Sequence, residues 1–220
     1  MVSSEKENCL YISERMEQCI WKYNIEQRKT TKWLTTDYRP TTLSVSCDGQ
    51  LLVINETSSI LMIYGSEADI LSSIQLQSDI QNPRHAIITS IGNFVILHQC
   101  VKKVEEGNTE SRGNTMELQW VVSEITRDGQ LVIRRFIPPN EIQRLNDPQY
   151  LAIAPDGRVF VADTGNNRVI SLDSNLKWNQ LQYERRFPRP WYLCYYEKHK
   201  QLFVGCDLYV GGNVYTFQSF

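Results

Sequence analysis

The sequence predicts an all-β chain built from a repeated four-stranded sheet, and three observations support this fold class. A proline followed by alternating apolar residues and a turn recurs, with Pro40 and Pro83 43 positions apart and Pro148 and Pro190 42 apart. Tight turns containing glycine separate the apolar runs at near-constant offsets. No segment shows the apolar periodicity of a helix. A period in the low forties with several short strands per copy is typical of β-propeller blades.

The copies form a single predicted domain, residues 1–220, in which five blades follow one another along the chain. The first copy has no proline-led strand, so we expect it to lack its inner strand. The third carries a polar insertion, and the last ends without an outer strand. The predicted blades cover residues 8–36 (partial), 37–78, 79–139 with a loop insertion at 100–116, 140–186, and 187–220 (partial).

The fourth copy shows the strand pattern most clearly. Leu151 and Ile153 alternate with small residues, as expected for an inner strand packed on one face. Asp156-Gly157 provides the positive backbone angles of a tight hairpin. The apolar run 159–161 then predicts a strand buried on both faces between neighbouring blades. Each copy therefore predicts an antiparallel sheet whose outermost strand faces solvent.

The segment "PDGRVFVADTGNNRVISLD" resembles an NHL repeat, the blade unit of NHL-type β-propellers. The match is strongest at residues 146–173, and the other copies are degenerate. The resemblance implies an NHL-type propeller of about five visible units with incomplete terminal ones, in an open arc or partial ring. We expect Asp163 to accept backbone N–H bonds across its own turn and Arg168 to reach a neighbouring carbonyl or carboxylate, so that both are structural.

Composition and charge exclude several classes of function. The net charge of −2 gives no global basic field, so strong phosphate-driven binding is not expected. No export signal and no apolar run of about 18 residues is present, which predicts a cytoplasmic chain without membrane association. The six cysteines are spread out without a C-x-x-C pair, which predicts free thiols rather than a zinc site.

Family resemblance places the binding face at the loops that precede each inner strand. Arginines and aromatics gather there, above all in "YERRFPRPWY", and this composition is common at protein-binding hot spots and in single-stranded RNA sites. The predicted partner-binding residues are Arg39, Arg84, His85, Tyr150, Arg185, Arg186, Arg189, Trp191 and Tyr192.

The resemblance favours a non-catalytic protein-interaction scaffold, as in the substrate-recruiting domains of tripartite-motif ubiquitin ligases. RNA binding through the same face is the alternative. No cofactor, metal or small-molecule substrate is expected, and an open ring would favour self-association through exposed sheet edges.

A metal-dependent lyase or lactonase-like propeller enzyme is the third hypothesis. By register, His85, His98 and His199 fall on separate strands and turns and cannot converge on one metal. Lactonase-like relatives use channel-facing carboxylates and amides, for which Asp147, Asn82 and Asp79 are the candidates. With no nucleophile elbow or phosphate loop, the sequence predicts that the chain is not an enzyme.

Overall fold

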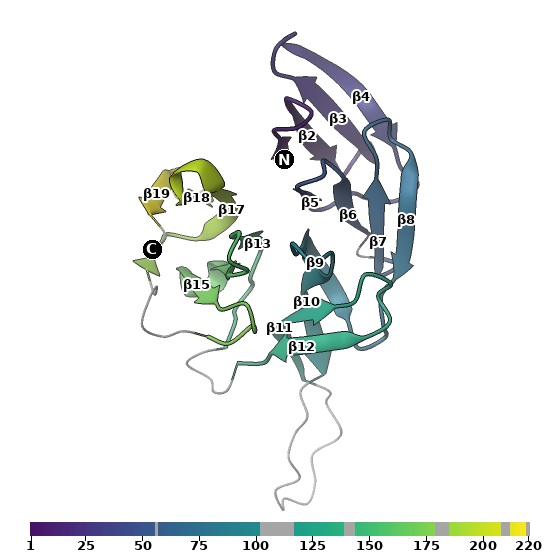
Figure 1. The fold of residues 1–220 in the computed structure, drawn as a ribbon. Helices are drawn as coiled ribbons and strands as arrows, with labels where there is room; N and C mark the ends of the chain where they lie inside the picture. The colour runs from purple at the N-terminus through teal and green to yellow at the C-terminus, as the bar shows by residue number, and fades with distance from the viewer. Residues whose placement is uncertain (56, 102–116, 139–143, 179–184, 208–211, 219–220) are drawn as a thin grey trace, which may run out of the picture.

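The structure, a computed structural model, is built from β-strands, with two 3-10 turns at Thr164–Asn166 and Glu197–His199. It describes residues 1–55, 57–101, 117–138, 144–178, 185–207 and 212–218. Five antiparallel sheets fan out around a shared centre (Figure 1). The all-β prediction and the five-bladed propeller arrangement are both confirmed.

Each sheet is one blade, and its strands run in chain order from the centre outward (Figure 1). Blade 1 contains β1 (Val2–Ser4), β2 (Cys9–Glu14), β3 (Cys19–Asn24) and β4 (Lys29–Thr35). Blade 2 contains β5 (Leu43–Val45), β6 (Leu51–Asn55), β7 (Ile60–Tyr64) and β8 (Ile70–Gln75). Blade 3 contains β9 (Gln81–Ile88), β10 (Phe94–Val101), β11 (Leu118–Ile125) and β12 (Val132–Phe136). Blade 4 contains β13 (Tyr150–Ile153), β14 (Val159–Asp163), β15 (Arg168–Leu172) and β16 (Arg185–Arg186). Blade 5 contains β17 (Pro190–Tyr196), β18 (Gln201–Cys206) and β19 (Val214–Gln218).

Blade 1 differs from the sequence prediction because it has an inner strand. Val2–Ser4 pairs with Cys9–Tyr11, so the sheet has four strands. The strand carries neither the proline of the other copies nor the Asp-Gly turn of blades 2 and 4. Its hairpin turn is closed instead by Asn8 at φ 47°, a left-handed conformation that asparagine tolerates better than most residues.

The apolar core lies between the blades rather than within any one of them. Four clusters of buried residues join blades 1 and 2, 2 and 3, 3 and 4, and 4 and 5. Strand β14 is buried along its whole length, as its continuous apolar run predicts. Within the described ranges, no such cluster joins blade 5 to blade 1. The ring is therefore closed by packing at four junctions and open at the fifth.

Arg168 reaches a carboxylate as predicted, but the backbone N–H that Asp163 accepts belongs to Asn146 and not to its own turn. Arg168 Nε donates to Asp163 Oδ2 at 2.7 Å, and the two side chains are 5% and 0% exposed. The other carboxylate oxygen, Oδ1, accepts the Asn146 N–H at 2.7 Å. Burial raises the pKa of Asp163, and these donors oppose that shift. The pair fixes the turn of blade 4 to the chain segment that enters the blade.

The predicted insertion in blade 3 lies between two long paired strands, β10 and β11. Strands β10 and β11 pair from Phe94 with Ile125 to Val101 with Leu118. Residues 102–116, which hold most of the predicted insertion, lie outside the described residues. Over the described ranges, no helix is both long and apolar enough to span a membrane.

Candidate functional site

A polar cluster lies where the inner strands of blades 3 and 4 begin. Residues that precede the blade prolines take left-handed backbone angles there, with φ 45° at Asn82, 47° at Asp147 and 46° at Arg189. For a non-glycine residue this conformation costs on the order of 1–3 kcal/mol, and such strain often accompanies functional positions. We call Asn82, Arg84, Asp147 and Gln149 the polar rim.

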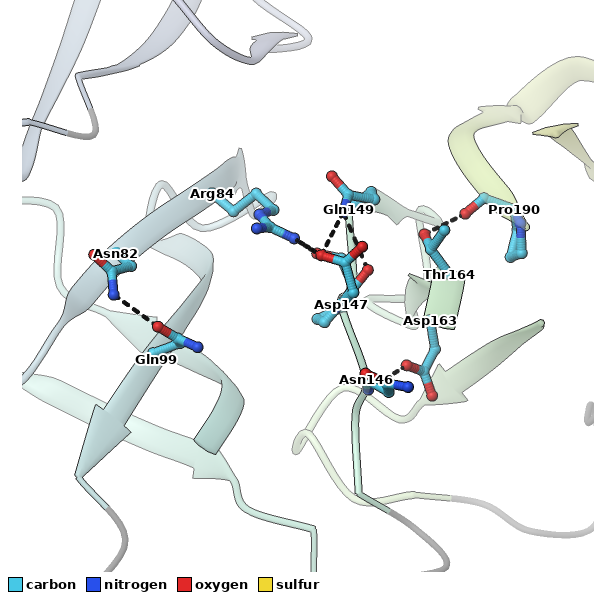
Figure 2. Close-up of polar contacts among 10 residues, drawn as sticks. Asn82, Arg84, Gln99, Asn146, Asp147, Gln149, Asp163, Thr164 and Pro190 are labelled. Atoms are coloured by element: carbon cyan, nitrogen blue, oxygen red, sulfur yellow. Dashed lines mark hydrogen bonds and ion pairs between the residues drawn. The ribbon is translucent and has the colours of Figure 1, made fainter. Parts of the chain in front are cut away.

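Asp147 is the centre of this rim (Figure 2). Its Oδ1 accepts from Arg84 Nη1 at 2.6 Å and from Gln149 Nε2 at 2.8 Å. Asp147 Oδ2 has no hydrogen-bond donor among the described residues, and the side chain is 47% exposed. The carboxylate is thus held in place through one oxygen and presents the other to solvent.

Arg84 is positioned by three groups besides its own strand. Its guanidinium donates to Asp147 and to the Pro148 carbonyl, the latter at 2.9 Å, and lies 4.3 Å from the ring centre of Trp120. This stacking orients the planar cation. Figure 2 shows Arg84 reaching from blade 3 toward Asp147 at the start of blade 4. Asn82 adds an amide to the same end of β9, where its Nδ2 donates to Gln99 Oε1 at 2.7 Å.

His85 and Tyr150 lie next to the rim in sequence, but they are buried in the centre of the ring. Leu151 N–H donates to His85 Nδ1, so Nε2 carries the proton and faces the Leu43 carbonyl, both at 3.4 Å. The Tyr150 hydroxyl donates to the same carbonyl at 2.8 Å, and the two rings lie 3.8 Å apart. Burial lowers the pKa of His85 to about 3 and raises that of Tyr150. Both residues thus join blades, and their predicted part in partner binding stays a prediction.

A cavity of about 660 Å³ lies on the other side of this His85–Tyr150 pair. It is lined by residues of all five blades, including turn residues such as Cys47, Ser90 and Gly157. His85 and Tyr150 line it, whereas the rim residues do not. The cavity therefore opens toward the Asp-Gly-turn face, opposite to the face predicted for binding.

The remaining predicted site residues are dispersed. Arg39 is exposed in front of Pro40, and Arg189 pairs with Asp207 at 3.2 Å in blade 5. Trp191 is half-buried, and Tyr192 is exposed at the cavity with its edge against Tyr150. Arg185 and Arg186 form β16, and their side chains lie outside the described part of the chain. The structure thus brings Arg84 to the rim and His85, Tyr150 and Tyr192 to the cavity.

Sequence reasoning considered Asp147 and Asn82 only as lactonase-like candidates, and Asp79 with them. Asp79 pairs with Arg135 at 2.7 Å, a residue of outer strand β12, and is not part of the rim. Arg84 follows Pro83 and Asp147 precedes Pro148, so opposite charges lie beside the prolines of two consecutive blades. This pattern is the signal that could have identified the rim.

The donor set does not fit a metal ion. Among the described residues, no three His, Cys, Asp or Glu side chains come together in a way that could hold one. His85, His98 and His199 lie in β9, β10 and the 3-10 turn of blade 5. No catalytic step is therefore assigned to a metal.

Comparison with known proteins supports the fold and corrects the functional prediction. The NHL repeat family model matches residues 145–170, and no curated protein matches the sequence. A gluconolactonase from Xanthomonas campestris superposes with TM-score 0.69 and 16% identity, over 99% of this chain and 71% of that one. Hydrazine synthase of Kuenenia stuttgartiensis superposes with TM-score 0.67 and 17% identity, over 98% of this chain and 70% of that one. A streptogramin B lyase superposes with TM-score 0.58 and 14% identity, over 99% of this chain and 67% of that one.

These similar structures are enzymes, which contradicts the predictions of a non-catalytic scaffold and of a chain that is not an enzyme. At such identities the likeness itself establishes the fold alone. The predicted protein or RNA partners and the predicted self-association stay untested. The chain is thus a five-bladed β-propeller whose fourth blade matches the NHL repeat.

Proposed function

We propose that this chain is a propeller enzyme that hydrolyses a small lactone or related ester at the polar rim. The observation that supports the proposal most directly is the Asp147 carboxylate, which is fixed by Arg84 and Gln149 through one oxygen and is free to take a proton on the other. The fold is shared with a gluconolactonase, which makes a lactone the first substrate class to test.

The rim supplies the two groups that ester hydrolysis requires. Asp147 Oδ2 takes a proton from water, and the oxygen of that water forms a bond to the carbonyl carbon. Negative charge then develops on the carbonyl oxygen, and the Arg84 guanidinium stabilises it. The carbon–oxygen bond of the ring breaks, and the leaving alkoxide takes the proton back from Asp147. Water is consumed, and the product is a hydroxy acid.

The contribution of the Arg84–Asp147 pair to folding is small, which makes the mechanism testable. The Asp147 side chain is 47% exposed and ion pairs near the surface contribute about 0–1 kcal/mol, so substitution of Asp147 should leave the protein folded. General base catalysis typically contributes about 10²–10⁴-fold to a rate. A large loss of activity with little change in melting temperature is therefore the expected signature.

We expect Asp147→Asn to lower kcat for lactone hydrolysis at least about 100-fold, because the amide cannot accept the proton from water. The assay measures acid release from a panel of five- and six-membered lactones, with thermal melting of each variant in parallel. Asp156→Asn is the matched control, since Asp156 is an exposed carboxylate in a surface ion pair with Arg158, on the opposite face. Turnover retained by Asp147→Asn, or no turnover of any lactone by the native chain, would refute the proposal.

A further inference from the structure

We propose that the cavity at the centre of the ring binds an uncharged, mostly apolar small molecule. The cavity volume of about 660 Å³ lies within the range of about 300–1,000 Å³ that is usual for small-molecule sites. It extends from blade 1, through Val2 and Leu10, to blade 5, through Leu193 and Phe203. It therefore borders the junction between blades 5 and 1, where the described residues form no packed core.

The lining of the cavity determines the chemical class of the ligand. Apolar side chains, among them Val45, Ile87 and Ile153, make up most of it, and Tyr150 and Tyr192 contribute aromatic rings. No lysine or arginine of the described residues lines the cavity, and Glu197, the acidic side chain among its lining residues, is exposed at the turn after β17. Met1 also lines the cavity, and burial lowers the pKa of its amino group, which favours the neutral form of this amine. A charged ligand would therefore lose its hydration for little compensation, so an uncharged molecule is favoured.

Ser46 is a buried polar residue of the cavity that can orient such a ligand. Ser46 Oγ accepts the Gln50 N–H at 3.0 Å, and its own O–H has no acceptor among the described residues. The hydroxyl of Ser44, by contrast, already donates to the Ala86 carbonyl at 2.5 Å. Ser46 lines the cavity and is buried, so its free donor would be satisfied by a carbonyl or ether oxygen of the ligand.

Tyr192 provides the main exposed contact surface for the ligand. Its side chain is 51% exposed, and its ring packs edge-on against Tyr150 with 5.6 Å between ring centres. One face of the ring is thus left for a bound molecule. This proposal does not depend on the catalytic role of the rim, because Arg84 and Asp147 do not line the cavity.

Titration of the native chain with Nile red, an uncharged apolar dye with a carbonyl group, tests the proposal. We expect a saturable fluorescence increase with one dye per chain. Tyr192→Ala should weaken binding about five-fold, since a ring contact contributes roughly 1 kcal/mol. Tyr215→Ala is the matched control, an exposed tyrosine of the same blade that packs against Phe187 away from the cavity. An anionic naphthalene sulfonate dye of similar size should bind at least ten-fold more weakly.

Two cysteines report directly on the place of binding. Cys47 in blade 2 and Cys194 in blade 5 are exposed and line the cavity, whereas the other four cysteines are buried. Dye at the predicted site should slow the labelling of both thiols by N-ethylmaleimide, as followed by peptide mass spectrometry. Non-saturable dye binding, saturation without protection of either thiol, or equal affinity for the anionic dye would overturn the proposal. It would also be overturned if dye binding fell with increasing protein concentration, as expected for a cavity covered by a second copy.

Discussion

Replacement of Asp163 by alanine is expected to lower the free energy of unfolding by about 3–5 kcal/mol. The substitution leaves the Arg168 guanidinium buried without its carboxylate, and it also removes the acceptor of the Asn146 N–H. Asn166 Nδ2, which donates to the same carboxylate at 2.8 Å, loses its partner as well. Single domains commonly have a free energy of unfolding of about 5–15 kcal/mol, so this loss would be a large fraction of the total. Urea denaturation followed by circular dichroism measures the loss.

A second carboxylate of blade 4 separates the effect of burial from that of charge. Asp156 pairs with Arg158 at the same 2.7 Å distance, but on the surface. Asp156→Ala should therefore cost less than about 1 kcal/mol. In the double variant Asp163→Leu/Arg168→Met, which removes both buried charges, part of the lost stability should return. Equal losses in the two alanine variants would show that the buried pair does not stabilise the blade.

Lowering the pH from 7 to 5 is expected to reduce the free energy of unfolding by about 3–4 kcal/mol. Burial lowers the pKa of His85 to about 3 and of His98 to about 4, against about 6.5 in the unfolded chain. Above pH 6.5 both imidazoles are neutral in either state. As the pH falls below 6.5, the histidines of the unfolded chain bind protons while those of the folded chain stay neutral. The free energy of unfolding therefore decreases until the pH reaches the folded-state pKa values. Urea denaturation at several pH values between 7 and 5 measures this slope.

Burial is the main reason that the folded protein keeps His98 neutral, and the positive charge of Arg135 adds to this effect. Arg135 Nε donates to Ser123 Oγ, and that hydroxyl meets His98 Nε2, both at 2.8 Å. The remaining ring nitrogen faces the Gln99 carbonyl at 2.8 Å. A proton on Nε2 would leave the serine hydroxyl without its acceptor and bring a second positive charge close to Arg135.

Histidine variants identify the source of the pH dependence. His98→Gln should remove about half of the stability loss between pH 7 and 5, because one of the two buried imidazoles is gone. His199→Gln is the control, since His199 is exposed in the turn of blade 5 and should leave the slope unchanged. A native chain equally stable at both pH values would contradict the prediction.

Much of the fold follows from local patterns in the sequence. The alternation in 151–153, the Asp156-Gly157 turn and the continuous apolar run 159–161 predict a hairpin of two strands in blade 4, and the structure shows this hairpin as β13 and β14. The inner strand of blade 1 was missed because it is three residues long and its turn closes on Asn8 rather than glycine. A strand this short has no periodicity of its own and forms through pairing with β2.

The candidate site was harder to predict, because it depends on contacts between blades. A sequence shows that Arg84 and His85 are neighbours, but not that one reaches Asp147 at the surface while the other is buried beneath the rim. Alternation along a strand assigns side chains to two faces, and at the centre of a propeller both faces can be covered. The cavity lies at the opposite end of the inner strands from the predicted loops, and no local pattern encodes its position.

The open junction between blades 5 and 1 has a consequence for where the protein unfolds locally. Blades 2, 3 and 4 are each packed on two sides, whereas blades 1 and 5 are packed on one side within the described ranges. Local opening costs least where an element has a single neighbour, as in linear repeat arrays. Amide protons in β2 and β18 should thus exchange with deuterium well before those in β10. A propeller with a closed ring of blades would lack this gradient of protection.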